Sequence, residues 1–543
     1  MKTSSCDVLI VGAGPTGLMF ANLLLKSGIT NFRLLDQNEG PTPESRAIGI
    51  QAKTLELMKN IGVVDEFLKR GLVSKGARVF LHGKKRFEIS FEQLPFPDTP
   101  YPYVFFLSQT ETENILIEEI EKSGIPIERR TQFISLNQNE TGVESVVIGA
   151  DGSPETIHSQ FLIGCDGSHS KVRRELGLEF KGAPYPAEFI MADSKVDWDL
   201  SADKLTVFLE TGSVGVFFPL SNEHSRVLTT RVYEKNEVIP STEATTSSPA
   251  TLSEIEEGLR RTSHRNIKLS NPTWVTKFHV HHRSVSQTKI GNVFLAGDSS
   301  HIHSPVGAQG MNTGLQDAAN LTWKLAAVLK KQAATSILET YHSERWPIGQ
   351  KLLNFTDRAF NLAVSKNFLF IQARNIFLPV ITKLLSRFKA GQIFLFKFVS
   401  QLGIHYHKSE VVQEMISSSA SETFKTTLPS GNRAPNAKIN HENSVFDLIT
   451  GYQFHVLVLI RKNLSHEEIE ELKKVWDARP LMQKYKAKVH IIFSGHLLTN
   501  GTGLSSNSEE IFKRYGVTDQ ALFLVRPDGY IGYRTDDLWR AFI

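Results

Sequence analysis

Short apolar runs separated by glycine turns and polar stretches divide the start of the chain into regular elements. Residues 7–11 form an apolar run that ends at a glycine turn, and residues 18–26 have helical character and stop before Gly28. Glycine is the residue that most often follows the end of a helix. Residues 32–35 form a second apolar run that ends at Asp36. This order predicts a β–α–β unit with parallel strands.

The pattern changes at about residue 205. Runs such as 214–218 and 226–232 are rich in β-branched and aromatic residues and are separated by polar turns, which predicts an antiparallel sheet. Arg226 and Arg231 are an odd number of positions apart in one strand, so their side chains should point to opposite faces. A loop rich in Ser, Thr and Pro follows, and Ser253 with Glu256 predicts a capping box at a helix start.

The second half of the chain returns to alternating strands and helices. Residues 292–329 predict a strand, a turn rich in Gly, His and Pro, and a long helix, and residues 340–400 predict helices that carry many phenylalanines. Residues 429–431 mark a linker. A separate α/β unit is predicted beyond it. Its strands are expected at 454–460 and 489–493, its helices at 467–476 and 509–515, and a final hairpin at 521–534.

Composition places the chain among globular proteins of several domains. Its 543 residues correspond to roughly three to four domains, with 41% apolar and 22% charged residues. The net charge of +4 is too small and too evenly spread for nucleic acid as the main partner. Two cysteines exclude a disulfide framework and a zinc site of several thiolates. No signal segment or membrane-length apolar run is visible, so we expect a cytoplasmic protein.

One segment has an unusual balance of charge. Between residues 355 and 408, eight Lys and Arg residues stand against one acid, Asp357, and nine phenylalanines are interleaved with them. Basic and aromatic residues together are found in membrane-surface helices. The alternative is a set of helices that pack beneath the C-terminal unit or at a dimer interface. We favour packing, so membrane contact is not expected and a homodimer stays open.

The first motif with chemical meaning lies between the first strand and helix. It is a G-x-G-x-x-G sequence at residues 12–17, and its candidate binding residues are Gly12, Gly14, Pro15, Thr16 and Gly17. Such glycines permit a tight turn and let backbone N–H groups approach a pyrophosphate at a helix N-terminus. Asp36 lies 19 residues after Gly17, at the end of the second strand, where a carboxylate accepts from ribose hydroxyls. The motif therefore predicts a dinucleotide site.

Two further motifs follow apolar strands. In the first, residues 161–164 lead into Asp166 and Gly167, and Asp166 is expected either to cap N–H groups or to hold a ribose. Arg173 could meet a phosphate or face solvent. In the second, residues 291–296 lead into Gly297 and Asp298, whose carboxylate can accept from polyol hydroxyls.

The stretch after Asp298 leads into the long helix. Backbone N–H groups of Gly310, Met311 and Asn312 can face a ring carbonyl that becomes negative on reduction. A metal site made of Asp298, His301 and His303 is a competing interpretation. We favour packing of the two histidines in the loop, because no further cluster of ligands is evident.

The three motifs, in this order and spacing, resemble the class A flavin-dependent monooxygenases, the aromatic hydroxylases of the para-hydroxybenzoate hydroxylase type. Cys165, Asp166, Gly167, Ser170 and Arg173 match the family's C-D-G-x-x-S-x-x-R fingerprint, and Gly297 with Asp298 matches its G-D motif. Residues 304–312 look like the loop over the flavin ring, with Pro305 in its wall. Arg46 resembles the family's arginine near the FAD phosphates, and Gln109 resembles the residue that contacts the ribityl chain. Lys53 stands where the family often has arginine.

The end of the chain is similar to the thioredoxin-like extension of phenol, pentachlorophenol and polyketide hydroxylases. It has no cysteine, which excludes thiol redox chemistry. The resemblance implies an α/β fold with a Rossmann-type FAD-binding domain, an antiparallel-sheet substrate domain and this extension. The expected boundaries are 1–182 for the first part of the FAD domain, with about 75–105 joining the substrate region, then 183–275 for the substrate domain. The second FAD part and helical region span 276–428, and the thioredoxin-like domain spans 429–543.

The resemblance also implies the chemistry. Non-covalent FAD would be reduced by transiently bound NADPH or NADH, react with dioxygen to a flavin 4a-hydroperoxide, and transfer one oxygen to a phenolic or polycyclic aromatic substrate. The substrate would lie between the antiparallel sheet and the flavin, and Arg226 is a candidate contact, although a solvated sheet charge is the more common role. A non-oxygenating flavin oxidoreductase and an FAD-binding interaction protein are the alternatives. No other catalytic side chain is singled out, and a G-x-S-x-G nucleophile elbow is absent.

Overall fold

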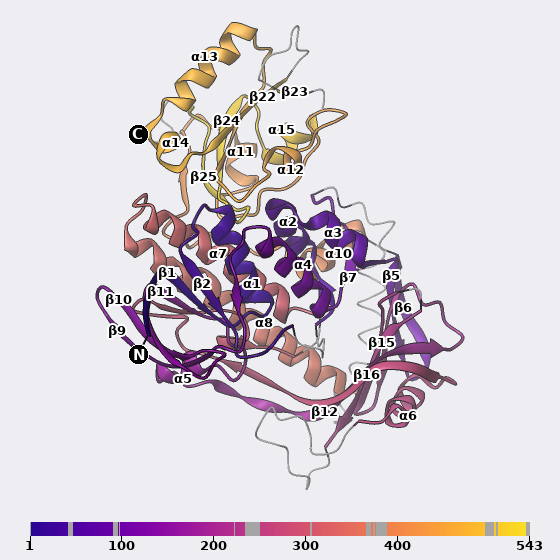
Figure 1. The fold of residues 1–543 in the computed structure, drawn as a ribbon. Coiled ribbons are helices and arrows are strands. Elements are labelled where there is room, and N and C mark those ends of the chain that lie inside the picture. The colour runs from indigo at the N-terminus through magenta and orange to yellow at the C-terminus, as the bar shows by residue number, and fades with distance from the viewer. Residues whose placement is uncertain are drawn as a thin grey trace.

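The described residues form four β-sheets with helices around them (Figure 1). The structure is a computed structural model. It describes residues 2–41, 47–90, 96, 98–221, 223–233, 250–304, 307–364, 371–372, 375, 388–494, 504–506 and 509–538. The first sheet carries the three motifs, the second is the predicted substrate sheet, and a third belongs to the C-terminal module, which we define as residues 429–538. A small three-stranded sheet completes the set.

The first sheet has the order β17-β18-β11-β1-β2-β8, and β10 and β9 extend it from β11. Its central strands are parallel, and the residues at their carboxyl ends are buried, as expected for a sheet covered on both faces; these are residues 8–11 of β1, 161–164 of β11 and 293–295 of β18. The bounds are β1 Lys2–Val11, β2 Phe32–Leu35, β8 Ile127–Glu128, β9 Gln132–Asn139, β10 Gly142–Ile148, β11 Pro154–Gly164, β17 Lys289–Ile290 and β18 Val293–Leu295.

Helices that pack on and around this sheet bury a large apolar core, in which α1 lies between α4 and α7. Their bounds are α1 Pro15–Lys26, α2 Ala52–Ile61, α3 Val64–Arg70, α4 Gln109–Glu121, α5 Lys171–Glu175, η1 Gly297–Ser299, α7 Gly310–Leu329, η2 Thr335–Leu338, α8 Glu339–Val364 and α10 Lys389–Val399. The three-stranded sheet consists of β3 Gly49–Ile50, β4 Leu72–Ser74 and β7 Val104–Phe106.

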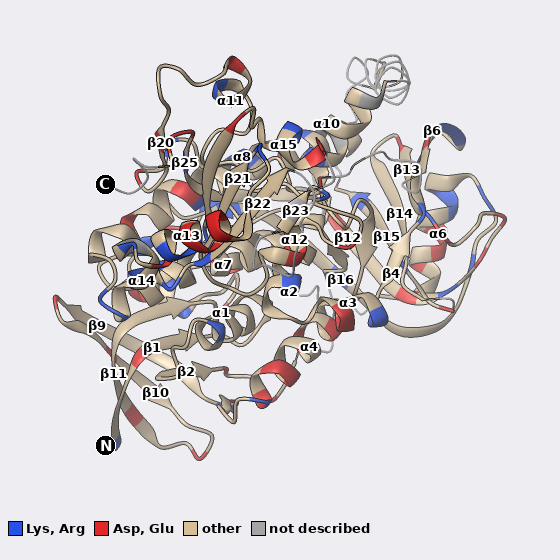
Figure 2. Ribbon diagram, turned by 90° about the horizontal axis from the view of Figure 1, so that it is seen from above, with Lys and Arg blue, Asp and Glu red and all other residues tan. Residues whose placement is uncertain are grey.

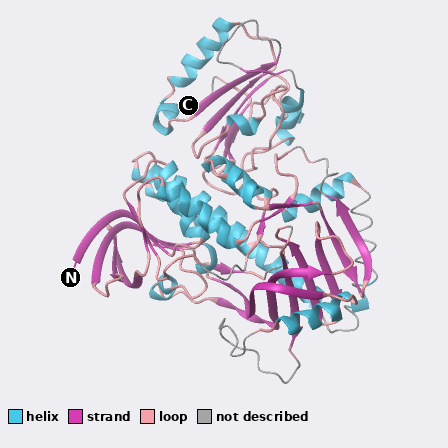
Figure 3. Ribbon diagram, turned by 45° about the vertical axis from the view of Figure 1, so that its right-hand side comes forward, coloured by secondary structure: helices cyan, strands magenta, loops and turns pink. Residues whose placement is uncertain are grey.

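The substrate sheet, the large group of strands at the lower right of Figure 3, has the order β19-β16-β12-β15-β14-β13-β5-β6. Its pairings are antiparallel except for that of β5 with β13, which is parallel. The bounds are β5 Gly76–Leu81, β6 Lys84–Ser90, β12 Lys181–Asp197, β13 Leu205–Glu210, β14 Ser213–Pro219, β15 Ser225–Val232, β16 Lys268–Ser284 and β19 His301–Ile302. Helix α6 (Leu252–Ser263) covers one face, and Phe360 of α8 packs into the apolar cluster of the other.

The C-terminal module contains a sheet of order β20-β25-β24-β21-β22-β23 and packs against α2 and α7 (Figure 1). Strand β20 and helix α11 come from the segment that precedes the module. The bounds are β20 Gln413–Met415, β21 His455–Ile460, β22 Lys488–Ser494, β23 Leu504–Ser506, β24 Gln520–Val525, β25 Ile531–Thr535, α11 Glu422–Thr426, α12 Val445–Leu448, α13 His466–Asp477, α14 Pro480–Tyr485 and α15 Glu509–Tyr515.

One local prediction is wrong, and two other predictions concern segments that the structure describes only in part. The capping box of α6 is formed by Thr251 and Glu254, not by Ser253 and Glu256, because the helix begins two residues earlier than the sequence suggested. Much of the basic, Phe-rich segment, and most of the loop after β15, lie outside the described residues. Lysine, arginine and acidic residues are mixed over the described elements (Figure 2). Within the described part of the chain, no helix has both the length and the apolarity needed to span a membrane.

Candidate functional site

The three sequence motifs meet at one edge of the first sheet. Val11, at the end of β1, is in register with Leu35 of β2 and with Gly164 of β11, and Gly164 is in register with Leu295 of β18. Each motif begins within two residues of the end of one of these parallel strands. The carboxyl ends of parallel strands are where open α/β sheets bind ligands. Strand topology therefore gathers residues separated by almost 300 positions into one site.

The glycine turn after β1 has backbone geometry that only glycine accommodates easily. Gly12 has φ of +103°, and a Cβ built there would lie 2.3 Å from the Cys165 carbonyl oxygen. A Cβ built on Gly14 would meet nothing within 4 Å. Gly14 is the N-cap of α1, Pro15 is at the first helical position, and no side chain caps the first N–H groups. The turn thus leaves open space beside a helix start that no side chain caps.

Asp36 fixes this turn from the end of β2. Its Oδ2 accepts from Ala13 N at 2.6 Å and its Oδ1 accepts from Asn38 N at 2.7 Å. The side chain of Arg129 lies 3.7 Å from Oδ2. The carboxylate therefore connects the glycine turn to residues just beyond the ends of β2 and β8. Its contact with an adenosine ribose stays a prediction.

Asp166 acts as a helix cap in the structure. Its Oδ2 accepts from Lys171 N at 2.7 Å and Val172 N at 3.1 Å, and its Oδ1 accepts from the Ser170 hydroxyl at 2.5 Å. Burial raises the pKa of Asp166, against the lowering effect of these bonds. Arg173 is buried and donates to the carbonyls of Ser168 and Ser299, so it ties this motif to the turn after β18. These bonds bear out the capping alternative, and a cofactor contact of Asp166 stays a prediction.

The Gly-Asp turn after β18 packs on the start of α1. Gly297 has φ of +62°, and a Cβ there would lie 2.6 Å from the Thr16 hydroxyl. The same hydroxyl would be 2.4 Å from a Cβ on Gly314 in α7. Asp298 is exposed in the 3₁₀ turn η1, while its neighbours on both sides are buried. Its carboxylate is therefore accessible to a polyol ligand.

Helix α7 begins at Gly310 without a capping side chain, and a Cβ on Gly310 would meet nothing within 4 Å. Asn312 is fully buried and holds this start in place: its Oδ1 accepts from Gln51 N at 2.9 Å and the Thr54 hydroxyl at 2.7 Å. Its Nδ2 donates to Gly49 O at 2.8 Å. Asn312 is thus a brace between α7 and α2. The sequence did not indicate Gln51 or Thr54, which lie about 260 residues away.

These features fit FAD. Two helix N-termini, those of α1 and α7, carry no side-chain cap, and both have open space beside a glycine. One suits an anionic pyrophosphate and the other a ring carbonyl that gains negative charge. Asp298 supplies an exposed acceptor between them in the chain. The donors and acceptors present therefore match the groups that FAD offers.

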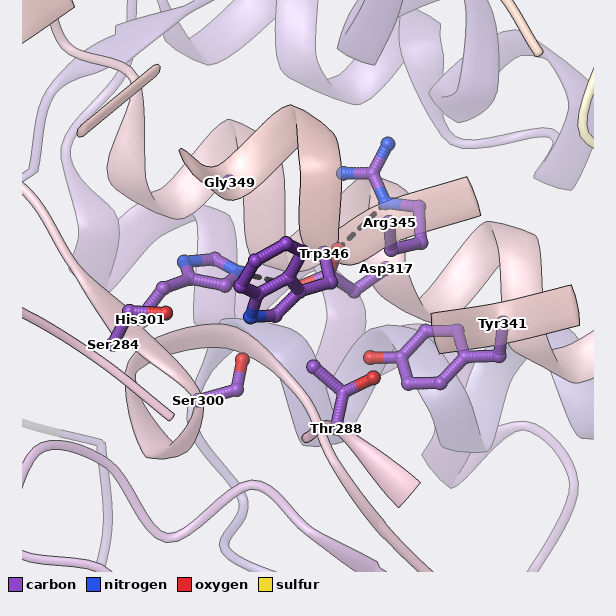
Figure 4. Close-up of a pocket in the computed structure, with 9 residues that line it drawn as sticks. All are labelled: Ser284, Thr288, Ser300, His301, Asp317, Tyr341, Arg345, Trp346 and Gly349. Atoms are coloured by element: carbon purple, nitrogen blue, oxygen red, sulfur yellow. Dashed lines mark hydrogen bonds and ion pairs between the residues drawn. The ribbon is translucent and has the colours of Figure 1, made fainter. Parts of the chain in front are cut away.

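A buried polar cluster beneath the Gly-Asp turn was not predicted. Asp317 of α7 accepts from Gly297 N at 3.1 Å, lies 2.8 Å from His301 Nε2, and accepts from Arg345 Nε at 2.7 Å. Figure 4 shows His301 and Arg345 pointing at Asp317 from two sides of a narrow pocket lined also by Tyr341 and Trp346. Although burial opposes ionisation, Arg345 and His301 lower the pKa of Asp317 to about 2. The sequence signal that could have indicated this cluster is a charged side chain, Asp317, in a helix whose residues are mostly buried.

His303 extends this cluster toward the loop that follows. Its Nε2 lies 3.0 Å from His301 Nδ1, and both rings are buried. Burial holds the pKa of His303 well below its ordinary value, so the ring is neutral near pH 7. The two histidines are therefore paired with each other and with Asp317.

The predicted site residues Gln109 and Arg226 lie in different elements, and both contact Ala47. Gln109 begins α4, its N–H donates to Ala47 O at 3.0 Å, and its side chain donates to Glu113. Arg226 is fully buried in a two-bond ion pair with Asp193, each bond 2.7 Å long, and its Nη1 donates to Ala47 O at 3.4 Å. Arg231 is on the exposed side of the strand, as the spacing predicted. Substrate contact by Arg226 stays a prediction.

Two predicted residues, Arg46 and Pro305, lie outside the described residues. The segments that flank them are both described, and both adjoin the site. Ala47 receives the bonds of Gln109 and Arg226, and Ser304 follows the paired histidines.

Known proteins resemble the chain over most of its length. Residues 5–356 match the family model described as FAD binding domain. The uncharacterized aromatic compound monooxygenase YhjG of Bacillus subtilis is 29% identical, over 90% of this chain and 93% of that protein. Pentachlorophenol 4-monooxygenase of Sphingobium chlorophenolicum is 33% identical, over 65% of this chain and 64% of that protein. The crystal structure of CabE, an aromatic hydroxylase from angucycline biosynthesis, has a TM-score of 0.70 and 27% identity, over 97% of this chain and 96% of that one.

Fold, motif geometry and these likenesses together define a flavin-dependent aromatic monooxygenase. The chain belongs to the FAD binding domain family, since more than half of it matches that model. Its cofactor is FAD. The non-oxygenating and non-enzymatic alternatives from the sequence are set aside.

Replacing Asp298 by alanine should weaken FAD binding. An exposed carboxylate that accepts from a flavin hydroxyl contributes about 1.5–3 kcal/mol, which is roughly a tenfold to hundredfold change in the dissociation constant. The constant can be measured by diluting the FAD-loaded protein and following the fluorescence of released flavin. Asp298→Asn keeps an acceptor oxygen and should lie between the two. Equal FAD affinity of the alanine variant and the native protein would remove Asp298 from the site.

Proposed function

We propose that the enzyme inserts one oxygen atom into a phenolic or polycyclic aromatic compound bound between the substrate sheet and the edge that carries the three motifs. The observation that carries this proposal is the position of β19. This strand follows the Gly-Asp turn by two residues and pairs with β16, so that His301 is in register with Ser284 and Ile302 with Arg283. The substrate sheet is thereby joined to the FAD-binding edge.

The interior face of the substrate sheet suits an aromatic compound. Tyr185, Phe189 and Phe278 lie on it, and the Phe360 ring of α8 lies 4.6 Å from that of Tyr185 and 5.5 Å from that of Phe189, between centroids. Such rings pack edge-to-face or offset against other aromatic groups. A second connection to the FAD domain is the contact between Phe106 and Phe218, 5.7 Å apart. These contacts support a substrate site that is apolar and aromatic.

The chain's own residues bind the cofactor, orient it and exclude water from the site. When bound, FAD supplies electron transfer from NAD(P)H and activation of dioxygen. The glycine turn after β1 would receive the FAD pyrophosphate, and Asp298 would accept from its polyol chain. The N–H groups at the start of α7, which Asn312 holds in place, would bind the flavin ring. Buried aromatic groups of the substrate sheet keep water away from the reacting ring, which strengthens each polar contact inside.

The organisation of the chain supports the same assignment. We propose the domain boundaries expected from the sequence, and a thioredoxin-like C-terminal domain that has no thiol chemistry. Both cysteines, Cys6 and Cys165, are buried and unpaired with each other. Burial raises the pKa of Cys6 to about 11 and that of Cys165 well above its ordinary value, so neither is a thiolate at neutral pH. Buried, unbridged thiols support a cytoplasmic location.

A substrate screen under labelled dioxygen tests the proposed function. The purified protein is mixed with NADH or NADPH, ¹⁸O₂ and a panel of simple phenols and polycyclic phenols, and the products are analysed by mass spectrometry. We expect one member of the panel to gain a single ¹⁸O atom and to stimulate NAD(P)H oxidation. The comparison of the two nucleotides also assigns the electron donor.

The matched control is the Asp298→Ala protein at the same concentration, without added FAD. It should show little product, because less flavin is bound. Oxidation of NAD(P)H that yields only hydrogen peroxide across a broad panel, with no labelled product, would contradict oxygen insertion.

A further inference from the structure

Helix α2 connects the start of α7 to the C-terminal module. On the flavin side, Gln51 precedes the helix and Thr54 lies in its first turn, and both donate to Asn312. On the other side, Lys53 Nζ donates to Asp528 O of the module at 3.0 Å and lies 4.7 Å from the centroid of the Tyr530 ring. Thr54 and Lys53 are neighbours in the first turn of α2, and they contact the start of α7 and the module, respectively.

Glu56, one turn further along α2, strengthens the same junction. Arg433 of the module donates to it at 2.9 Å, and Lys53 Nζ lies 3.8 Å away. Lys53 and Glu56 are both fully enclosed, with side-chain exposures of 3% and 2%. Lys53, where the family resemblance suggested an arginine, is thus a contact with the module in this structure.

Helices α7 and α8 make a second, independent connection. Arg345 of α8 donates to Asp317 at 2.7 Å and to Thr313 O at 3.1 Å, both in the first half of α7. Its neighbour Glu344 receives two bonds from Arg526 of the module, at 2.8 and 3.0 Å. Two adjacent residues of α8 therefore contact α7 and the module, respectively.

Further contacts close this second connection. Lys324 of α7 donates to Glu344 at 2.9 Å, and Arg526 donates to Asp528 within the module. Arg345 also donates to the Tyr406 hydroxyl at 3.0 Å, and the Tyr406 ring lies 4.4 Å from that of Tyr530. An unbroken series of hydrogen bonds and ring contacts thus runs from Gly297 to the module.

Because these charges are buried, the junction tolerates little change in its geometry. The side chains of Lys324, Glu344 and Arg526 are 0%, 1% and 2% exposed. A buried charge is tolerated only when its partners are in place, and removing one partner is strongly destabilising. The module cannot shift relative to α2, α7 and α8 without unpairing several of these groups. Its docking therefore restricts where the start of α7 can lie.

We propose that the C-terminal module is a clamp that positions residues 307–317 for FAD, so that docking of the module and binding of FAD strengthen each other. Lys53 and Arg526 are its positioning residues, because their bonds join the module to α2 and α8. This inference rests on FAD binding at the proposed site. Coupling between two binding events is reciprocal: whatever docking adds to FAD affinity, FAD must add to the stability of docking.

Two identical substitutions on α2 test the clamp. Lys53→Met removes the buried contact with Asp528 and Tyr530. Lys59→Met removes a partly exposed pair with Asp447, also a module residue, at 2.9 Å. Dilution of FAD-loaded protein, followed by flavin fluorescence, gives the dissociation constant of each. We expect Lys53→Met to weaken FAD binding at least tenfold and Lys59→Met to change it less than twofold. Equal, small changes in both would overturn the clamp.

Hydrogen exchange of the unmodified protein provides the reciprocal measurement and does not depend on a variant that folds. Amides of residues 526–531 should exchange several-fold more slowly at saturating FAD than at substoichiometric FAD. Amides of the distant helix α13 should change little. Unchanged exchange in 526–531, with FAD binding observed, would overturn the clamp while leaving the proposed function intact. Failure of the unmodified protein to bind FAD would instead contradict the proposed function.

Discussion

Replacement of Asp317 by alanine should cost about 3–5 kcal/mol of stability and most of the bound FAD. The carboxylate is 2% exposed and serves Gly297 N, His301 and Arg345 at once. Without it, the Arg345 guanidinium, itself 1% exposed, remains as a buried charge without its carboxylate partner. The Gly-Asp turn also loses the bond that fixes its first residue. Folding and cofactor binding should therefore fail together.

Thermal unfolding followed by circular dichroism, together with the FAD content of the purified protein, measures both effects. Asp65→Ala is the matched control, because Asp65 is exposed in the first turn of α3. An acid there interacts with the helix dipole and contributes only about 0.3–1 kcal/mol. An Asp317→Ala protein that melts near the control and keeps its flavin would show that the cluster is dispensable.

Local patterns were sufficient to predict the sheet that carries the site. The run from residue 32 to 35 became β2 with the same bounds, and the helix expected at 509–515 became α15. Apolar periodicity and glycine turns are short-range signals, and burial of a parallel sheet leaves continuous apolar runs. Because each motif follows its strand directly, the meeting of Gly12, Asp36 and Gly297 at one edge follows once the strands are parallel.

The polar contacts between distant elements could not be predicted in this way. The bond from Lys53 to Asp528 joins residues 475 positions apart, and nothing in the pattern around either residue indicates the other. Asp317 and Arg345 lie in helices whose apolar faces were visible, but the choice of partner depends on how those helices pack. Arg226 similarly looked like a candidate for a ligand contact, and the structure gives it Asp193, on the strand beside it.

Acid should destabilise the enzyme between about pH 4 and pH 2, and Asp317 should contribute much of this loss. The pKa of Asp317 is lowered to about 2 from an ordinary value of 3.8, and Arg526 and Lys324 likewise hold the pKa of Glu344 far below its ordinary value. A carboxyl group whose pKa is lower in the folded state binds a proton more readily when unfolded. Its stabilising contribution is therefore complete above the unfolded pKa and is lost as the pH falls through the folded one.

The shift of Asp317 corresponds to about 2 kcal/mol, at 1.36 kcal/mol for each pKa unit. The urea midpoint of the unmodified protein, measured by circular dichroism at pH 5, 4, 3 and 2.5, should fall steeply below pH 4. Asp317→Asn cannot titrate at this position, so its midpoint should start lower at pH 5 and decline less over the same range. Asp65→Asn should parallel the unmodified protein throughout. If the Asp317→Asn curve is as steep as that of the unmodified protein, the ionised Asp317 carboxylate is not what holds the Gly-Asp turn in place.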